Sequence, residues 1–366
     1  MARLIDFDEN FKSDQNIPAD TVIYNIKEGE FKIYGLYNPK EGSQFRRVPC
    51  DVAQNTSRGV YYNHTHTAGG RVRFKTDSSY IVLKAIFPTL CIMPHMAVTG
   101  STSFDIYADN HYYKTFVPPI KYVDDEIKGV KGCVPTFDLN GGYESVVKFD
   151  DKKMRDIVIN FPLYNDVSAV FIGLEKGCRL ESGNEYKHKK PVVYYGSSIT
   201  QGGCASRPGN SYQAIISRHL DCDFINLGFS GNAQAQPAMY EYISKLDMSV
   251  FVYDYDHNSP TKEHYEKTHS EMFNAIREKN PNLPIIMLTR PVYSAKMEDV
   301  QKRIEIAYKT YTDAKNSGDN NVYFINGINI GNSVDYDMMT VDGTHPNDFG
   351  FYCMAKEIEK VLKDLL

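Results

Sequence analysis

The chain of 366 residues contains no tryptophan, no long apolar run and no excess of basic residues. A transmembrane helix needs about 18 or more consecutive apolar residues, and no such run occurs in the sequence. The formal net charge is −5, so the chain lacks the positive charge that attracts nucleic acid or an anionic membrane surface. We therefore expect neither nucleic acid nor a membrane as a partner.

The sequence also lacks recognisable metal-binding or disulfide patterns. Its seven cysteines are scattered singly, and no C-x-x-C pair occurs, so neither a zinc cage nor a disulfide framework is indicated. His64 and His66 have no cluster of carboxylates beside them in sequence, and a surface or interdomain loop is favoured over a metal site. His257, His264 and His269 do not have H-E-x-x-H spacing. We expect no metal and no cofactor.

The first ten residues, M-A-R-L-I-D-F-D-E-N, lack the hydrophobic stretch of a signal peptide. A cytoplasmic location is the simplest interpretation, although a secreted protein trimmed of its signal peptide would have the same pattern. Nothing in the sequence indicates an oligomeric state.

Residues 1–185 have the pattern of an all-β domain, a sandwich of jelly-roll type. Short runs of β-branched and aromatic residues are separated by Gly, Pro, Asn and Asp, and helical periodicity extends over no more than a few residues. The predicted strands are 21–26, 31–37, 72–75, 80–87, 103–107 and 156–161. The polar, charged segment 181–190 is predicted to be an interdomain linker.

Residues 190–366 have a different pattern, in which strands and helices alternate. The predicted strands are 192–195, 224–227, 249–255, 285–289 and 322–325. The predicted helices are 211–220, 235–246, 262–279, 296–315 and 348–366. Strict β/α alternation implies a parallel sheet covered on both faces. The expected fold class is therefore α/β, a three-layer α/β/α domain of flavodoxin type preceded by the β-sandwich.

Two compact motifs in the second region contain residue types that can take part in catalysis. The segment 194–203, Y-Y-G-S-S-I-T-Q-G-G, predicts a buried strand that ends in a tight turn, where open α/β sheets place their sites. It is not a G-x-S-x-G elbow, because Thr200 replaces the second glycine. Asp342 and His345 lie three residues apart near the other end. A nucleophilic serine needs a base, and the base needs an orienting acid. The two motifs supply all three residue types.

The segment 196–202, G-S-S-I-T-Q-G, resembles the first block of the SGNH (GDSL-type) esterases and acylhydrolases. Ser198 stands at the nucleophile position, and Ser197 replaces the usual aspartate. The segment 226–231, N-L-G-F-S-G, is similar to the second block, and the Asp342-x-x-His345 motif is similar to the last block.

Residues 252–258, V-Y-D-Y-D-H-N, resemble the third block, with Asp256 in place of a glycine. The N-terminal half resembles the β-sandwich of a bacterial two-domain subfamily at 67–72, T-A-G-G-R-V, and at 104–107, F-D-I-Y. The family resemblance therefore extends over both halves of the chain.

The resemblance implies a role for each matched residue. Ser198 would be the nucleophile, His345 the general base and Asp342 the acid that orients the imidazole. The N–H groups of Ser198 and Gly228 and the side chain of Asn258 would form the oxyanion hole. Each such donor contributes roughly 2.7–4 kcal/mol.

Three further residues near strand ends are candidates for substrate binding: Arg207, Asp256 and Arg290. For the two arginines, a salt bridge that holds a loop is at least as good an interpretation.

The resemblance points to O-acetyl groups on carbohydrates as the substrate, cleaved through an acyl-enzyme without a cofactor. Tryptophan, the favoured sugar-stacking residue, is absent, but the 27 tyrosines are potential substitutes. A lysophospholipase or thioesterase is the enzymatic alternative. A carbohydrate-binding protein with a vestigial esterase site is a further alternative, against which the intact Ser198, Asp342 and His345 argue.

Overall fold

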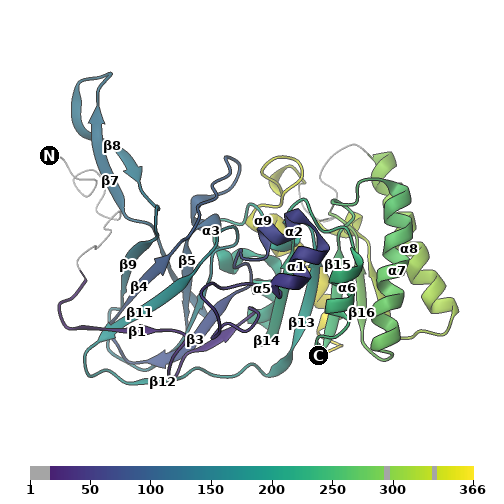
Figure 1. Ribbon diagram of the computed structural model, residues 1–366, viewed down its shortest axis with the longest axis horizontal. Coiled ribbons are helices and arrows are strands. Elements are labelled where there is room, and N and C mark those ends of the chain that lie inside the picture. Colours follow the sequence, from purple (N-terminus) through teal and green to yellow (C-terminus); the bar gives the residue numbers. More distant parts are fainter. Residues whose placement is uncertain (1–16, 292–296, 332–335) are drawn as a thin grey trace.

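The computed structural model describes residues 17–291, 297–331 and 336–366, and two regions lie side by side in it (Figure 1). The first region is mostly β, and the second contains a parallel sheet with helices, which confirms the predicted fold class. Within the described ranges, no helix combines the length and the apolar character that crossing a membrane requires.

The first region is a sandwich of two antiparallel sheets. In spatial order, one sheet contains β1 (Thr21–Asn25), β11 (Ala169–Glu175), β4 (Tyr80–Ile86) and β9 (Tyr143–Lys148). The other contains β12 (Leu180–Ser182), β3 (Arg71–Thr76), β10 (Arg155–Asn160), β5 (Phe104–Ala108) and β6 (His111–Phe116), with β2 (Lys32–Tyr34) also paired to β3. Apolar side chains of both sheets, such as Val72, Leu83 and Ile157, share one buried core. The six predicted strands overlap β1 to β5 and β10.

The second region is built on a five-stranded parallel sheet. Its strands in spatial order are β14 (Cys222–Gly228), β13 (His188–Gly196), β15 (Val250–Asp254), β16 (Ile285–Leu288) and β17 (Val322–Ile325). In chain order this is 2-1-3-4-5, the arrangement of flavodoxin-like sheets. Every residue of β15 and β16 is buried, because helices cover both faces of the sheet.

Alternate side chains of each strand pack under different helices. Val192 and Tyr194 of β13 share a core with α5 (Tyr212–Leu220) and α9 (Asp348–Leu362). Val193 and Tyr195 share the opposite core, under α6 (Pro237–Ile243), α7 (Lys262–Lys279) and α8 (Met297–Asn316). The five predicted helices correspond to α5 to α9, although residue 296, the first predicted for α8, lies outside the described residues, and the single turn α4 (Ser198–Gln201) was not predicted. Short 3₁₀ turns occur at η3 (Pro208–Asn210), η4 (Gly327–Asn329) and η5 (Tyr336–Met338).

The first region is mostly β, as predicted, but it also contains short helices that the sequence pattern did not indicate. The structure has α1 (Cys50–Thr56), α2 (Arg58–Asn63) and the single turn α3 (Val98–Ser101). Helices of six or seven residues are too short for a clear 3.6-residue pattern, and such helices depend on tertiary packing. Ala53 of α1 and Val60 of α2 are buried in the core beneath α6 and α7, so they extend the helical layer of the parallel-sheet region.

The linker between the regions is shorter than the predicted segment 181–190. The strand β12 takes up its start, and β13 begins at His188. Tyr186, between them, is buried and its hydroxyl accepts a hydrogen bond from Arg71 Nε at 2.6 Å. The two regions are therefore held tightly at their covalent connection.

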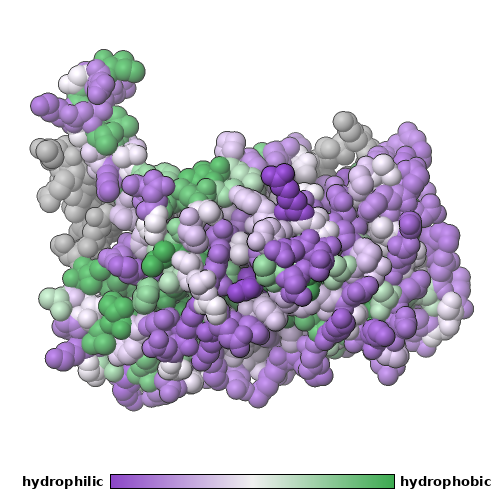
Figure 2. Space-filling view, in the orientation of Figure 1, coloured by the Kyte–Doolittle hydropathy of each residue, from purple (hydrophilic) through white to green (hydrophobic). Residues whose placement is uncertain are grey.

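A hairpin of β7 (Ile120–Asp125) and β8 (Val130–Phe137) projects from the sandwich region (Figure 1). Hydrophobic side chains lie at its tip and along the adjacent sandwich surface, whereas the end formed by α7 and α8 is mainly hydrophilic (Figure 2). Ile127 at the hairpin turn is 98% exposed. The sandwich region thus carries the more apolar part of the visible surface.

Candidate active site

Ser198 lies directly after β13, the strand between β14 and β15. It is the first residue of the short helix α4 (Ser198–Gln201), and Ser197 caps this helix by accepting a hydrogen bond from Ile199 N at 3.2 Å. The first turn of a helix leaves its N–H groups without intrahelical acceptors. The fold therefore places the Ser198 hydroxyl and its N–H group together at the carboxyl end of a central strand, where open sheets bind ligands.

The structure brings Ser198, His345 and Asp342 into one hydrogen-bonded chain. The distance from Ser198 Oγ to His345 Nε2 is 2.9 Å, and that from His345 Nδ1 to Asp342 Oδ2 is 2.8 Å. Asp342 Oδ1 also accepts hydrogen bonds from the backbone N–H groups of His345 at 2.8 Å and Thr344 at 3.0 Å. The acid therefore fixes both the ring and the backbone of the histidine.

Electrostatics keep the Asp342 carboxyl ionised. Partial burial on its own would raise its pKa, but the hydrogen bonds from the His345 backbone and imidazole and from the Thr344 backbone outweigh burial and lower the pKa to about 2. An ionised acceptor at Nδ1 favours the tautomer that carries its proton on Nδ1. The Nε2 lone pair of His345 then faces the Ser198 hydroxyl, as proton abstraction requires.

The backbone after Ser198 folds closely around the imidazole of His345. The carbonyl of Ser198 accepts hydrogen bonds from Gly203 N at 2.8 Å and from the Tyr164 hydroxyl at 3.0 Å. A Cβ atom at residue 203 would lie 2.9 Å from that hydroxyl and 3.4 Å from His345 Cδ2. Glycine at this position therefore allows the His345 ring and Tyr164 to approach the Ser198 carbonyl together.

The assignment of Gly228 N–H to an oxyanion hole does not fit the structure. This N–H already donates to Asn226 Oδ1 at 2.9 Å. A Cβ at residue 228 would lie 2.1 Å from Gln201 N, so the glycine is needed for close packing of β14 on α4. By contrast, the Gly231 N–H has no hydrogen-bond partner in the described part of the chain. The sequence pattern alone did not distinguish a packing glycine from a glycine with a free donor.

Asn258 follows β15 and has one amide atom fixed. Its Oδ1 accepts a hydrogen bond from Ala233 N at 3.2 Å, in the loop after β14. The same loop donates from Ala235 N to the Tyr195 hydroxyl at 2.8 Å, so it crosses the end of β13. No described residue accepts a hydrogen bond from Asn258 Nδ2, which leaves a free side-chain donor after β15.

Arg207 is held by the sandwich region. Its Nη1 donates to Asp105 Oδ2 at 2.9 Å and to the Tyr107 hydroxyl at 2.5 Å, and its guanidinium lies 3.9 Å from the Tyr112 ring centroid. Asp105 is fully buried and also accepts from Gly209 N at 2.8 Å. These contacts support the salt-bridge interpretation, because the charge of Arg207 is paired with that of Asp105.

Asp256 and Arg290 form an ion pair with each other. Arg290 Nε lies 2.9 Å from Asp256 Oδ2, and Asp256 is fully buried. Burial raises the pKa of a carboxyl, but the Arg290 charge and hydrogen bonds outweigh it and lower the pKa of Asp256. The backbone carbonyl of Asp256 accepts from Arg303 Nη1 at 2.8 Å. Asp256 therefore joins the ends of β15 and β16 to α8.

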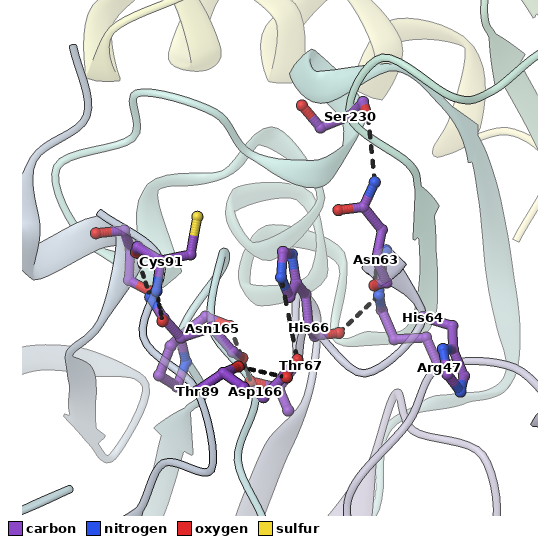
Figure 3. A network of polar contacts seen from close by, with 12 residues as sticks. Arg47, Asn63, His64, His66, Thr67, Thr89, Cys91, Asn165, Asp166 and Ser230 are labelled. Atoms are coloured by element: carbon purple, nitrogen blue, oxygen red, sulfur yellow. Dashed lines mark hydrogen bonds and ion pairs between the residues drawn. The ribbon is translucent and has the colours of Figure 1, made fainter. Parts of the chain in front are cut away.

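Buried polar contacts connect the sandwich region to the site, and no sequence motif predicted them. Arg47 is 1% exposed and donates to the backbone carbonyls of Asn226 at 3.2 Å, Gly228 at 2.5 Å and His66 at 2.8 Å. Asn63 Nδ2 donates to the Ser230 carbonyl at 3.2 Å, and Figure 3 shows both side chains within one network. These contacts fix the loop after β14, which carries Gly231.

His66 is buried and contacts the parallel-sheet region, which fits the interdomain alternative of the loop prediction and not the surface one. Its Nδ1 lies 3.1 Å from Gln201 Nε2, and Gln201 Oε1 accepts from Ser230 N at 3.0 Å. Burial lowers the pKa of His66 to about 4, although Asp166 opposes the shift. The neutral ring is suited to pairing with the Gln201 amide.

His95 and Cys204 reach His345 from two other segments. The ring centroids of His95 and His345 are 5.2 Å apart, and Cys204 Sγ donates to the His95 carbonyl at 3.4 Å. His95 belongs to the loop between β4 and α3 of the sandwich region. Neither residue lies in a sequence motif that marks it, so only the fold identifies them.

Comparison with known proteins adds two family matches. Residues 189–363 match the family model described as the GDSL-like lipase/acylhydrolase family. Residues 21–180 match the model of the N-terminus of esterases of the SGNH-hydrolase type. A sequence comparison with curated proteins returns no match. The resemblance derived from the four sequence blocks is confirmed.

Several solved structures share both regions. A putative GDSL-like lipase from Bacteroides ovatus has 25% identity and a TM-score of 0.79, with 94% of this chain and 98% of that chain covered. A salicylyl-acyltransferase from a tetracycline biosynthetic pathway has 18% identity and a TM-score of 0.73, covering 95% and 98%. An acetyl xylan esterase from the rumen bacterium Butyrivibrio proteoclasticus has 12% identity and a TM-score of 0.56, covering 94% and 98%. At identities below 25%, the last two show the fold.

Proposed function

We propose that this chain, which belongs to the GDSL-like lipase/acylhydrolase family and is a carboxylic ester hydrolase, removes small acyl groups, above all acetyl, from carbohydrate hydroxyls. The observation that carries the proposal is the unbroken chain of hydrogen bonds from Ser198 through His345 to Asp342. This is the arrangement that makes a serine nucleophilic.

In the proposed mechanism, Ser198 Oγ attacks the ester carbonyl while His345 Nε2 takes its proton. Asp342 holds the tautomer and stabilises the imidazolium that forms. His345 then gives the proton to the sugar oxygen, which leaves as an alcohol, and an acyl-enzyme remains. Water then attacks the acyl carbonyl while His345 Nε2 takes one of its protons, the bond between the acyl carbon and Ser198 Oγ breaks, and His345 returns the proton to Oγ as the carboxylic acid leaves.

The tetrahedral intermediates need donors directed at their oxyanion. We assign this role to the N–H of Ser198 and the Nδ2 group of Asn258, and we add the N–H of Gly231 in place of Gly228. The support is that Gly228 N–H is engaged by Asn226, whereas Gly231 N–H and Asn258 Nδ2 have no acceptor among the described residues. Loss of one such donor typically costs about 10²–10³ in kcat.

A groove in the sandwich region supports a carbohydrate as the substrate. It has a volume of about 470 Å³, and its lining includes Tyr61, Tyr62, Arg46, Arg58 and Asp166. Tyr61 and Tyr62 are 42% and 60% exposed, and exposed aromatic faces with nearby charged groups suit a polar ring with apolar faces.

The groove also has a physical connection to the nucleophile. The Tyr62 ring packs edge-on against the buried His66 ring, with centroids 5.4 Å apart. His66 in turn contacts Gln201 of the helix that begins with Ser198. We propose acetyl as the acyl group and a carbohydrate as its carrier because an acetyl xylan esterase has the same fold.

The acyl preference is tested with p-nitrophenyl acetate, butyrate and octanoate. We expect the highest kcat/KM for acetate, with each methylene that does not fit costing about 1–3 kcal/mol of discrimination. A maximum at octanoate would overturn the carbohydrate proposal in favour of a lipase or lysophospholipase, and faster turnover of acyl thioesters would favour a thioesterase.

The sugar preference is tested with a panel of acetylated oligosaccharides followed by mass spectrometry. We expect Tyr62→Ala to lower kcat/KM on the preferred oligosaccharide and to leave p-nitrophenyl acetate hydrolysis unchanged. The matched control is Tyr308→Ala, a tyrosine of α8 that is 50% exposed and outside the groove. Equal effects of Tyr62→Ala on both substrates would contradict the assignment of the groove to sugar binding.

A further inference from the structure

Three potential metal ligands from distant parts of the sequence meet beside the nucleophile. One ligand atom each of His95, Cys204 and His345 lies within 4.8 Å of the other two. His95 comes from the sandwich region, Cys204 follows α4, and His345 precedes α9. Neither ring nitrogen of His95 has a hydrogen-bond partner among the residues that the structure describes. The fold therefore assembles a thiol and two imidazoles that no sequence motif predicts.

We propose that His95, Cys204 and His345 form a binding site for a thiophilic divalent cation, Zn²⁺ by its ligand chemistry, and that the bound ion inhibits ester hydrolysis. A thiolate and imidazoles are the ligands that Zn²⁺ prefers, and a site of three protein ligands leaves the fourth position for water. The inhibition rests on the proposed function, in which His345 is the general base. The binding of the ion itself does not depend on the proposed function.

The contact with Asp342 determines which nitrogen of His345 binds the ion. Asp342 Oδ2 lies 2.8 Å from Nδ1, so Nδ1 keeps its proton and Nε2 offers a lone pair. A carboxylate on the far nitrogen of a histidine is the usual outer partner of a zinc ligand. The same Nε2 lone pair lies 2.9 Å from Ser198 Oγ. Zinc and the Ser198 proton therefore compete for one electron pair.

The backbone holds Cys204 in a conformation that favours glycine. Its φ is 73°, in the left-handed region, although two glycines directly precede it. A residue with a side chain in this region carries strain that is characteristic of functional sites. Cys204 is 6% exposed, and its Sγ donates a hydrogen bond to the His95 carbonyl oxygen. The strained backbone keeps the sulfur beside both imidazoles.

Binding of the ion requires the loss of the Cys204 thiol proton and a small movement of the three side chains. Burial and the nearby Asp342 charge raise the pKa of the Cys204 thiol to about 12, so the thiol must lose its proton as the sulfur–zinc bond forms. One proton passes to solvent, and no electron is transferred. Tetrahedral zinc separates its ligand atoms by about 3.3–3.6 Å. The three side chains therefore need to close by about 1.5 Å or less.

Cobalt(II) tests the site without reference to activity. Titration of the full-length protein with CoCl₂ is expected to produce a thiolate-to-cobalt charge-transfer band. Cys204→Ser should abolish the band, and His95→Gln should weaken binding. The matched controls are Cys133→Ser on β8 and His111→Gln on β6, which replace exposed residues of the same types. A band of equal intensity in wild type and Cys204→Ser would overturn the site.

Zinc titrations of p-nitrophenyl acetate hydrolysis test the inhibition. The metal-free rate of each protein serves as its own reference. The inhibition constant for ZnCl₂ should rise in Cys204→Ser by more than the roughly 10–100-fold that loss of an outer-shell partner costs, and the two control variants should behave as wild type. Equal inhibition of wild type and Cys204→Ser would contradict the proposal. A Cys204-dependent cobalt band in a protein without esterase activity would support the site and contradict the proposed function.

Discussion

The parallel-sheet region and the sandwich region contribute different kinds of groups to the site. The parallel-sheet region supplies Ser198, just after β13, and Asp342 and His345, in the segment before α9. The sandwich region supplies groups that bind the backbone or supporting side chains. Arg47 contacts strand-end carbonyls, and Tyr164 contacts the carbonyl of Ser198.

The burial of these groups makes the difference sharper. Arg47 and Tyr164 are each 1% exposed, whereas the side chains of His345 and Asp342 are 19% and 34% exposed. Of the candidate reacting groups, His345 and Asp342 are thus partly exposed while Ser198 is buried, and the supporting groups lie in the interface. We therefore expect substitutions in the parallel-sheet region to change the rate, and substitutions at the interface to change stability.

The largest expected effect is that of Ser198→Ala. Loss of a triad nucleophile costs about 10⁶ in kcat, and the fold should remain intact because the hydroxyl contacts only the His345 ring. Ser197→Ala is the matched control. It removes a helix cap that is worth about 0.5–2 kcal/mol, and most of the activity should remain. Both variants are assayed with p-nitrophenyl acetate and by urea unfolding. If Ser198→Ala keeps more than a few per cent of activity, Ser197 becomes the candidate nucleophile.

Asp342→Asn should cost about 10⁴ in kcat, because an amide no longer fixes the productive tautomer of His345. The carboxyl has a pKa of about 2, so the wild-type acid stays ionised through the whole range in which the folded protein can be assayed. We expect the deficit of the variant to persist at every pH between 5 and 9. Recovery of wild-type rates at any pH in a kcat profile would argue against the orienting role.

Arg207→Ala tests the expectation that substitutions at the interface between the two regions change stability. Removal of the guanidinium leaves the buried Asp105 with fewer donors, although Gly209 N and Asn160 Nδ2 remain at 2.8 Å each. We expect a loss of about 1–3 kcal/mol in the free energy of unfolding and an unchanged KM for p-nitrophenyl acetate.

Lys190→Ala is the control for this variant, because it breaks an exposed ion pair with Asp247 that is worth about 0–1 kcal/mol. Urea unfolding and steady-state kinetics report the two quantities. A large increase in KM without destabilisation would return Arg207 to the substrate site.

The last prediction concerns the pH dependence of stability. Burial lowers the pKa of His66 from 6.5 to about 4, so the unfolded chain binds more protons than the folded one between these values. Stability is therefore lost as the pH falls from about 6.5 to about 4. In His66→Gln, the slope of unfolding free energy against pH in this window should decrease by up to about 1.4 kcal/mol per unit. Urea midpoints at pH 7, 5.5 and 4.5 measure it. Equal slopes in both proteins would show that His66 does not contribute.

The comparison also separates what local sequence predicts from what it does not. The strands and helices of the parallel-sheet region were predicted to within a few residues, because buried strands and long amphipathic helices carry strong periodic patterns. The helices α1 and α2 escaped prediction, since their stability comes from burying Ala53 and Val60 against another region. Similarly, Gly228 and Gly231 lie three residues apart in one motif, and only packing against α4 distinguishes them.

The sequence by itself predicted the α/β alternation, the two-region organisation and the family, and it marked Ser198, His345 and Asp342 as candidate residues, because these depend on local periodicity and on short motifs. The tertiary structure alone decided that Arg207 binds Asp105 and that Asp256 binds Arg290, since charge type does not specify a partner. It also decided that His95 and Cys204 meet the ring of His345. Contacts between segments that are distant in the sequence arise from the packing of whole sheets and loops, which leaves no periodic trace in the sequence.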